Sequence, residues 1–142
     1  MKLSKRSEYG LRAMLDLAAE PGRTAIPLHV LATRNHIPVK FLESIFNSLR
    51  NAGIVQSARG PGGGYCLGRQ ASQITFGEII RILDGTLAPV SCVSQIAYEP
   101  CSCPDESSCS LRVVMSDVRS AILAVVDRTT LEDSIRRMKP IG

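Results

Sequence analysis

The stretch PVKFLESIFNSLRNAGIVQSARGPGGGYCLG, residues 38–68, is the most informative about the fold, because its hydrophobic period changes partway along. As far as Gly53, apolar residues recur at the three- and four-residue spacing of one helical face; they are Phe41, Leu42, Ile45, Phe46 and Leu49. Gly53 suits a helix C-terminus. The β-prone pieces IVQSAR and YCLG follow, joined by GPGGG. The stretch predicts an amphipathic helix and then a β-hairpin with a glycine-rich tip.

Two more helices are expected upstream of this stretch. In residues 4–20 apolar side chains recur at helical spacing, Ser4 can cap the first turn, and Pro21 with Gly22 stops the helix. In residues 27–35, Pro27 suits a first helical position. Three short helices followed by a hairpin are the elements of a winged helix-turn-helix, in which the second and third helices form the helix-turn-helix itself.

Downstream, residues 73–85 predict a helix that begins with Thr75 and Glu78 in capping-box spacing. Residues 86–108 show no periodicity, and a loop this long is usually functional or disordered. A long helix then follows, and its apolar stripe consists of Leu111, Val114, Met115, Val118, Ala121, Ile122, Val125 and Val126. So wide a stripe exceeds what a small headpiece covers, so we expect a second copy of the chain to pack against it.

The expected fold is therefore mainly α with a small β-hairpin wing: a winged helix-turn-helix plus a long C-terminal dimerisation helix. Three parts are expected. Residues 1–70 form the winged helix-turn-helix DNA-binding domain, residues 71–110 a connecting helix and cysteine-rich loop, and residues 111–142 the dimerisation helix and tail.

Charge follows the same division. Residues 1–70 contain ten Lys or Arg against four Asp or Glu, whereas residues 71–142 contain seven against nine. The basic first part is suited to binding a polyanion, and the slightly acidic second part is suited to a role in assembly or regulation. No apolar run approaches the roughly 20 residues that span a bilayer, and no apolar segment of a secretion signal follows the basic N-terminus. We expect a cytoplasmic protein whose partner is double-stranded DNA and not a membrane.

The glycine-rich tip RGPGGGYCLG does not fit a nucleotide-binding loop, which needs a Lys followed by Ser or Thr and then a helix. It is either a plain flexible hairpin or a wing whose glycines allow close approach to DNA while Arg59 reaches a groove or phosphate. In the preceding helix, Lys40 can donate to guanine or phosphate, and Glu43 can accept from cytosine. For any single charged residue, a solvated helix face is the alternative. The candidate DNA contacts are Lys2, Lys5, Arg34, Val39, Lys40, Glu43, Arg50, Arg59, Gly60, Gly62 and Gly63, and Arg6 belongs to the same basic set.

Four of the five cysteines, Cys92, Cys101, Cys103 and Cys109, lie in the loop. A reducing compartment favours metal ligands or redox centres over disulfides. Zinc usually shows paired two-residue spacings and often a nearby His, and neither occurs here. A redox pair of Cys101 with Cys103, and inert thiols, stay open. An iron–sulfur cluster fits best, because thiolates suit iron and a polar loop can wrap the cluster. Cys66, in the hairpin, is expected to be a buried small side chain.

The segments KLSKRSEYGLRAMLDLA, PVKFLESIFNSLRNAGIV, RGPGGGYCLG and FGEIIRILDG together resemble the bacterial winged-helix regulators typified by the iron–sulfur assembly regulator IscR and the nitric-oxide sensor NsrR. The resemblance covers essentially the whole chain. It implies a homodimeric transcription factor that pairs through its long C-terminal helix and binds a pseudo-palindromic operator. It also implies that an iron–sulfur cluster controls this binding, with 2Fe–2S favoured and 4Fe–4S as the alternative. An enzyme is not expected, because no region combines Cys with His or Ser with His.

The resemblance also implies a set of ligands. Cluster-binding members typically use three loop cysteines, which here are Cys92, Cys109 and either Cys101 or Cys103; the interval from Cys92 to Cys103 is longer than is usual in the family. The fourth ligand is a loop His in some branches and a helix-one acid of the other subunit in the nitric-oxide sensors. This loop has no His, and Glu8 stands at the position of that acid, so Glu8 is either an oxygen ligand or a plain surface carboxylate.

Two other functions remain open. One is a cluster-free regulator of the same fold, controlled by thiol oxidation or by a partner protein. The other is a small electron-transfer or metal-trafficking protein, which leaves the basic helix-turn-helix and the wing unexplained.

Overall fold

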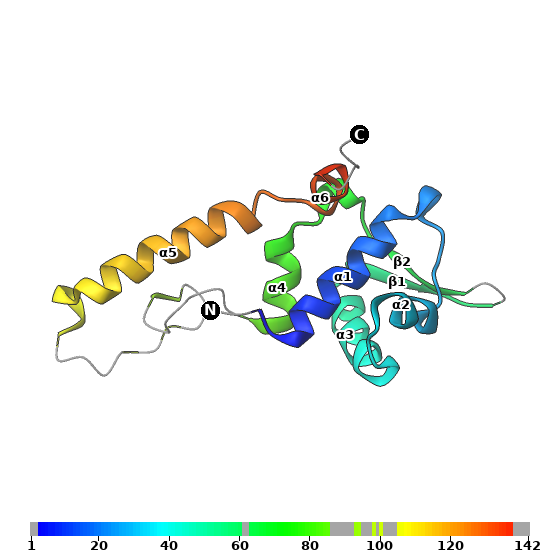
Figure 1. Ribbon diagram of the computed structural model, residues 1–142, viewed down its shortest axis with the longest axis horizontal. Helices are drawn as coiled ribbons and strands as arrows, with labels where there is room; N and C mark the ends of the chain where they lie inside the picture. The colour runs from blue at the N-terminus through cyan, green and yellow to red at the C-terminus, as the bar shows by residue number, and fades with distance from the viewer. Residues whose placement is uncertain are drawn as a thin grey trace.

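The computed structural model describes residues 3–60, 63–85, 93–94, 98, 100 and 105–137. Its elements in chain order are α1 (Lys5–Ala19), η1 (Pro21–Arg23), α2 (Leu28–Asn35), α3 (Val39–Asn51), β1 (Val55–Ala58), β2 (Gly64–Leu67), η2 (Ala71–Gln73), α4 (Phe76–Asp84), η4 (Glu106–Ser108), α5 (Ser110–Val126) and α6 (Leu131–Arg137). In Figure 1 the hairpin and α5 project from opposite ends of the remaining helices. This is the winged helix-turn-helix with a long C-terminal helix that the sequence predicts.

Helix α1 lies at the centre of the helical cluster. The Ser4 side-chain oxygen accepts from the Ser7 backbone N–H at 3.0 Å and caps the helix, as expected. The inner face includes Met14 and Leu17, which are buried. Gly10 is also on this face, where a Cβ atom would meet the side chains of Leu83 and Ile45. Glycine therefore lets α1 approach α4 and α3 closely.

A tight turn joins α2 to α3 and completes the helix-turn-helix. Pro27 was predicted to be the first helical residue, but it is the residue before α2, so the helix begins one position later than predicted. His36 ends α2 in the left-handed conformation, with φ of 53°. Helix α3 then begins after Pro38, and its predicted inner face is confirmed: Leu42, Ile45, Phe46 and Leu49 are fully buried, while Phe41 is partly buried.

The hairpin is attached to the helices through β2. Ile26 bonds to Tyr65 of β2 through two backbone hydrogen bonds of 2.9 and 2.8 Å. The Tyr65 ring meets Phe46 of α3 edge-on at 5.0 Å between centroids. Cys66 is half-buried and not fully buried as expected, because one face of this two-stranded sheet remains uncovered. Strand β2 is thus packed on the core and the tip of the hairpin projects.

The start of α4 is joined to the end of α5. The predicted cap is present, since the Thr75 side-chain oxygen accepts from the Glu78 backbone N–H at 3.2 Å. The Glu78 carboxylate, however, bonds to Arg69 and does not return to the cap. Next to this cap, the Phe76 N–H donates to the Thr129 carbonyl at 3.0 Å, and Arg81 pairs with Asp127. These contacts fix the orientation of α5 relative to the helix-turn-helix.

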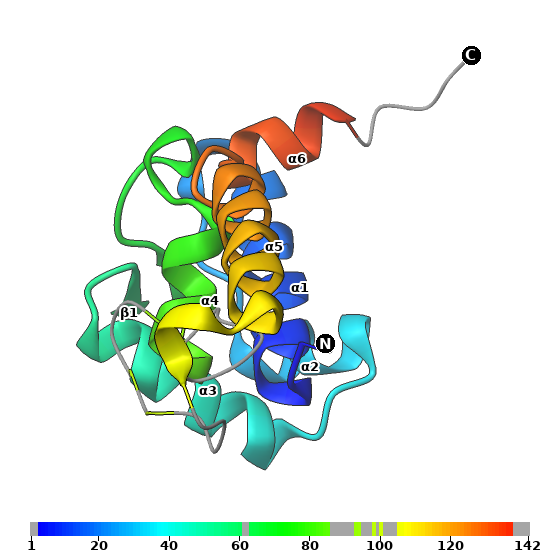
Figure 2. The same cartoon turned by 90° about the vertical axis from the view of Figure 1, so that its left-hand side faces the viewer.

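Helix α5 divides the predicted stripe between two faces. Met115, Ile122 and Val126 are half-buried, and Val126 packs on the core. The other apolar residues of the stripe follow a three-then-four spacing, and we call this row the α5 seam; it consists of Leu111, Val114, Val118, Ala121 and Val125, of which Val118 is half-buried and the other four are exposed. Figure 2 shows α5 on the outer side of the molecule. In the part of the chain that the structure describes, no helix is long and apolar enough to cross a bilayer.

Candidate nucleic-acid interface

The outer face of α3 is a polar strip opposite its buried face. Its exposed residues are Val39, Lys40, Glu43, Ser44, Asn47, Arg50 and Asn51. Lys40 is 96% exposed, and its ammonium lies 3.9 Å from the Glu43 carboxylate. A pair this exposed contributes about 0–1 kcal/mol, so exchanging it for contacts with another charged molecule costs little. The strip includes the predicted residues Val39, Lys40 and Glu43.

Two features of this strip were not predicted. Arg6 of α1 donates to the hydroxyl oxygens of Ser44 at 3.1 Å and Ser48 at 2.5 Å. Arg6 therefore ties α1 to the flank of α3. Asn47 lies one turn beyond Glu43 and is exposed. Its position was available from helical spacing, because Lys40, Glu43 and Asn47 follow the i, i+3, i+7 pattern opposite the apolar stripe.

The hairpin tip carries Arg59, which is exposed and makes no ion pair with the described residues. Gly60 has φ of 95°, a conformation that favours glycine. At Gly63 a Cβ atom would lie 2.6 Å from the Ala58 carbonyl oxygen and 2.8 Å from that of Gly60. Glycines therefore permit the tight backbone path that presents Arg59. The predicted contact Gly62 lies outside the described residues.

The remaining basic candidates have different surroundings. Arg34 of α2 pairs with Glu20 at 3.3 Å and links α2 to the end of α1. Lys5 pairs with Glu8 at 3.4 Å, and its ammonium lies 5.7 Å from the centre of the Tyr9 ring. Arg50 is exposed in the last turn of α3. Lys2 lies outside the described residues. Lys40, Glu43 and Arg50 are thus together on one helix, while Arg34 and Lys5 make ion pairs on neighbouring helices.

Of the predicted loop ligands, the structure describes only Cys109, whose half-buried thiol stands at the N-terminus of α5. Cys92, Cys101 and Cys103 lie outside the described residues. The described residues contain no group of three or more His, Cys, Asp or Glu side chains that could hold a metal. Asp105, nearby in the sequence, accepts hydrogen bonds from Ser107 and Ser108, which lower its carboxyl pKa. Asp105 therefore serves a local turn.

The start of the loop is anchored to α5. Val93, next to Cys92 in sequence, is buried, and its carbonyl accepts from Arg119 Nη1 at 2.9 Å. Sequence reasoning missed this contact, because nothing in the local pattern relates residues 26 positions apart. A displacement of Val93 would therefore act directly on α5 through Arg119.

Glu8, the candidate oxygen ligand, is on the first turn of α1 with its side chain 41% exposed. Its carboxylate lies 3.4 Å from Lys5 Nζ and 3.7 Å from Arg12 Nη1. Exposed ion pairs of this kind are weak. The carboxylate is therefore accessible to another partner that could replace the two cations.

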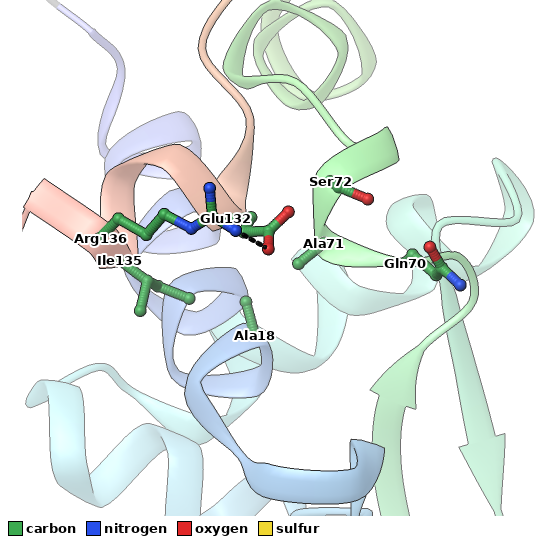
Figure 3. A pocket seen from close by; sticks show the side chains of 7 residues that line it. All are labelled: Ala18, Gln70, Ala71, Ser72, Glu132, Ile135 and Arg136. Carbon is green, nitrogen blue, oxygen red and sulfur yellow. Dashed lines mark hydrogen bonds and ion pairs between the residues drawn. The ribbon is translucent and has the colours of Figure 1, made fainter.

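A separate depression of about 390 Å³ lies between α1, η2 and α6 (Figure 3). Its charged lining residues, Glu132 and Arg136, bond to each other at 2.8 Å. The other lining residues are Ala18, Gln70, Ala71, Ser72 and Ile135. None of these residues forms a nucleophile–base pair, and none belongs to the α3 strip or the cysteine loop.

Comparison with known proteins places this geometry among regulators. The model of the Rrf2 family, described as iron-dependent transcriptional regulators, matches residues 3–137. An rrf2-like HTH-type transcriptional regulator of Rhodobacter capsulatus is 39% identical, over 97% of this chain and 95% of its own. Among solved structures, CymR, the global cysteine regulator of B. subtilis, has a TM-score of 0.82 at 35% identity, covering 98% of this chain and 99% of its own. IscR of T. potens has a TM-score of 0.78 at 30% identity, covering 100% and 94%.

Proposed function

This chain belongs to the Rrf2 family of transcriptional regulators, and we propose that it binds a pseudo-palindromic operator as a homodimer whose grip is controlled by an iron–sulfur cluster in the cysteine loop. The observation that carries the proposal is the exposed polar strip of α3, next in the chain to a projecting glycine hairpin that presents Arg59. Both features suit contact with a duplex more than contact with a small molecule.

On DNA, the first turns of α3 enter the major groove. Val39, Lys40 and Glu43 then face base edges or phosphates. Gly60, Gly62 and Gly63 let the hairpin backbone come close to the duplex, and Arg59 reaches a groove or a phosphate. Lys5, Arg34 and Arg50, together with Lys2, supply phosphate contacts, and Lys5 and Arg34 first release their weak ion pairs.

Dimerisation uses the α5 seam. Its three-then-four spacing is that of a coiled-coil interface, and Leu111, Val114 and Val125 are each more than half exposed in the single chain. Covering such a row of apolar side chains with a second copy is stabilising, because it removes apolar surface from water. A two-fold dimer presents two copies of α3, which explains a symmetric operator.

The cluster would be held by Cys92, Cys109 and either Cys101 or Cys103, with Glu8 of the other subunit as an oxygen ligand. Cys109 suits this role by its position, because its half-buried thiol stands between the loop and the first turn of α5. When bound, the cluster supplies a centre that responds to oxidants, nitric oxide or iron supply. The family description, which is iron-dependent regulation, supports the same assignment.

Contacts within the chain connect the cysteine loop to the helices that carry the DNA-binding surface. Arg119 holds the Val93 carbonyl against α5, and Arg81 with Asp127 holds the end of α5 against α4. Helix α4 packs on α1 and α3. A shift at the start of the loop therefore alters the relative positions of the two copies of α3, and with them the stability of the DNA complex.

Anaerobic purification tests the proposal. We expect brown protein with visible sulfide-to-iron absorption, loss of that absorption in Cys92→Ser and Cys109→Ser, and no loss in the control Cys66→Ser, whose thiol lies in the hairpin. Operator affinity should differ between the holo-protein and these two variants and should fall steeply with rising salt. Protein that never takes up iron, yet binds one promoter with unchanged affinity, rules the cluster out.

Glu8→Ala tests the oxygen ligand. If Glu8 binds the cluster, the variant alters the visible absorption or circular dichroism of the holo-protein and shortens its lifetime in air. The matched control is Glu20→Ala, a carboxylate at the opposite end of α1 that pairs with Arg34. An unchanged spectrum together with unchanged operator binding shows that Glu8 is a surface residue.

A second candidate is a cluster-free regulator that responds to thiol chemistry or to a partner protein. The observation that favours it is the structural similarity to the cysteine regulator CymR, which is at least as high as that to IscR. It predicts colourless protein after anaerobic reconstitution, with operator binding that changes on oxidation and recovers on reduction. Cys101→Ser and Cys103→Ser should then remove the response.

A further inference from the structure

We infer that Asn47 reads an adenine and that, with Glu43, it makes α3 select a cytosine and an adenine about two base pairs apart in each half-site. The inference rests on the proposed DNA-binding function and adds to it a residue and the bases it reads. It is drawn from the outer face of α3 as the structure presents it.

Lack of partners distinguishes Asn47 from the two serines on its flank. Asn47 is exposed on the face opposite the buried row of Leu42, Ile45 and Leu49. Within the described residues its carboxamide makes no hydrogen bond. Its polar neighbours on the flank, Ser44 and Ser48, already accept from Arg6. Asn47 is therefore available to a partner outside the chain, while the two serines serve to hold α1.

The chemistry of the two side chains defines what they recognise. A carboxamide both donates and accepts, so it matches the N7 acceptor and the N6 amino donor that adenine presents in the major groove. A carboxylate only accepts, so Glu43 matches the cytosine N4 amino group. Lys40, 96% exposed on a flexible stem, is a point charge that serves phosphate as readily as guanine.

Helix and duplex dimensions give the spacing. Glu43 and Asn47 are one turn apart, which is about 6 Å along the axis at 1.5 Å per residue. Base pairs are stacked about 3.4 Å apart, so a helix lying along the groove places these side chains over base pairs roughly two steps apart. The cytosine and the adenine are therefore expected close together, on the part of the half-site that α3 covers.

Selection from random duplexes tests the inference with the full-length protein. We expect the wild-type protein to enrich a symmetric motif containing the cytosine and the adenine. Asn47→Ala should lose the preference for adenine alone, and Glu43→Ala the preference for cytosine alone. Discrimination at the adenine should fall by roughly five- to 150-fold, the range of one bidentate contact. Gln73→Ala, an exposed amide in η2 and outside α3, is the matched control and should leave the motif unchanged.

A change of one atom in the DNA then separates direct reading from an effect on folding. Replacing the selected adenine by 7-deazaadenine removes the N7 acceptor. It should weaken wild-type binding roughly two- to tenfold, the value of one hydrogen bond, and leave Asn47→Ala unaffected. If the Asn47→Ala motif equals the wild-type motif, or if both proteins respond equally to 7-deazaadenine, the inference is wrong while DNA binding stands. A wild-type protein that selects no motif overturns the proposed function and the inference together.

Discussion

Asp127, at the end of α5, accepts two hydrogen bonds from Arg81 of α4, at 2.7 and 2.9 Å. Arg81 lowers the carboxyl pKa of Asp127 because it stabilises the ionised form, and burial opposes this only in part. The same pair raises the pKa of Arg81. A side chain at Gly77 would collide with this carboxylate. This pair, between residues 46 positions apart, thus helps to join the end of the long helix to α4.

We expect Asp127→Asn to lower the free energy of unfolding at pH 7 by roughly 0.2–1 kcal/mol, because both partners are over a third exposed and solvent screens the pair. A lowered folded-state pKa gives stability that is present above the unfolded pKa of about 3.9 and is lost as the pH falls through the folded value. Urea unfolding at pH 7 and below pH 3 measures this. The difference between wild type and variant should disappear in acid.

The control for this prediction is Asp117→Asn, on the same helix, which makes no ion pair with the described residues. It should leave stability nearly unchanged at both pH values. If the cost of Asp127→Asn were equal at the two pH values, the charge of Asp127 would not be responsible.

Among the elements, the hairpin shows how local sequence controls a functional surface. Its two strands pair in register from Val55 with Leu67 at the base to Ala58 with Gly64 next to the tip. Ile26 extends the pairing on the outer side of β2, and a Cβ atom at Gly64 would collide with the Ile26 carbonyl. The strands are therefore held by backbone contacts up to the start of the tip, and changes within the tip should affect ligand binding more than folding.

Gly63→Ala tests this property of the hairpin. The new methyl group would meet two backbone carbonyl oxygens, which cannot move aside as a flexible side chain can. We expect the tip to rearrange, operator affinity to fall by roughly tenfold or more, and the thermal midpoint to change by only a few degrees. Ser57→Ala, an exposed residue of the same hairpin, should bind DNA normally. Normal binding by Gly63→Ala would mean that the tip does not approach the duplex.

For the whole molecule, the two faces of α5 bear on the proposed dimer. One face packs Val126 on the core and carries Arg119 to the loop, while the α5 seam is exposed except at half-buried Val118. A single chain therefore leaves most of a long apolar row uncovered, and in the proposed dimer a second copy covers it and joins two headpieces through one helix pair.

Val114→Glu should convert the proposed dimer to a monomer, because it places a charge within an apolar interface. Val113→Glu is the matched control. The two valines are 54% and 61% exposed in the chain, but Val113 lies off the seam. Sedimentation velocity should show a monomer for the first variant and a dimer for the second. Two dimers, or two monomers, would place the interface elsewhere.

Much of this fold could be predicted from local patterns. Apolar spacing revealed the inner face of α3, the glycine-rich tip revealed the hairpin, and capping residues such as Ser4 and Thr75 marked helix starts. These features depend on a few neighbouring residues, so the sequence alone contains them. The start of α2 at Pro27 and the full burial of Cys66 were predicted wrongly by a small margin. Both depend on neighbouring elements.

Other features depended on how distant segments meet. Periodicity predicted one broad stripe on α5, yet packing against α4 divided it. The residues of a helix do not by themselves specify which side another element will cover. The anchoring of Val93 by Arg119 and the pairing of Arg81 with Asp127 join residues far apart in the chain. The same holds for the strip of α3, where Arg6 occupies the serines and leaves Asn47 available. Local spacing specified the elements, whereas their packing determined which side chains remain available for recognition.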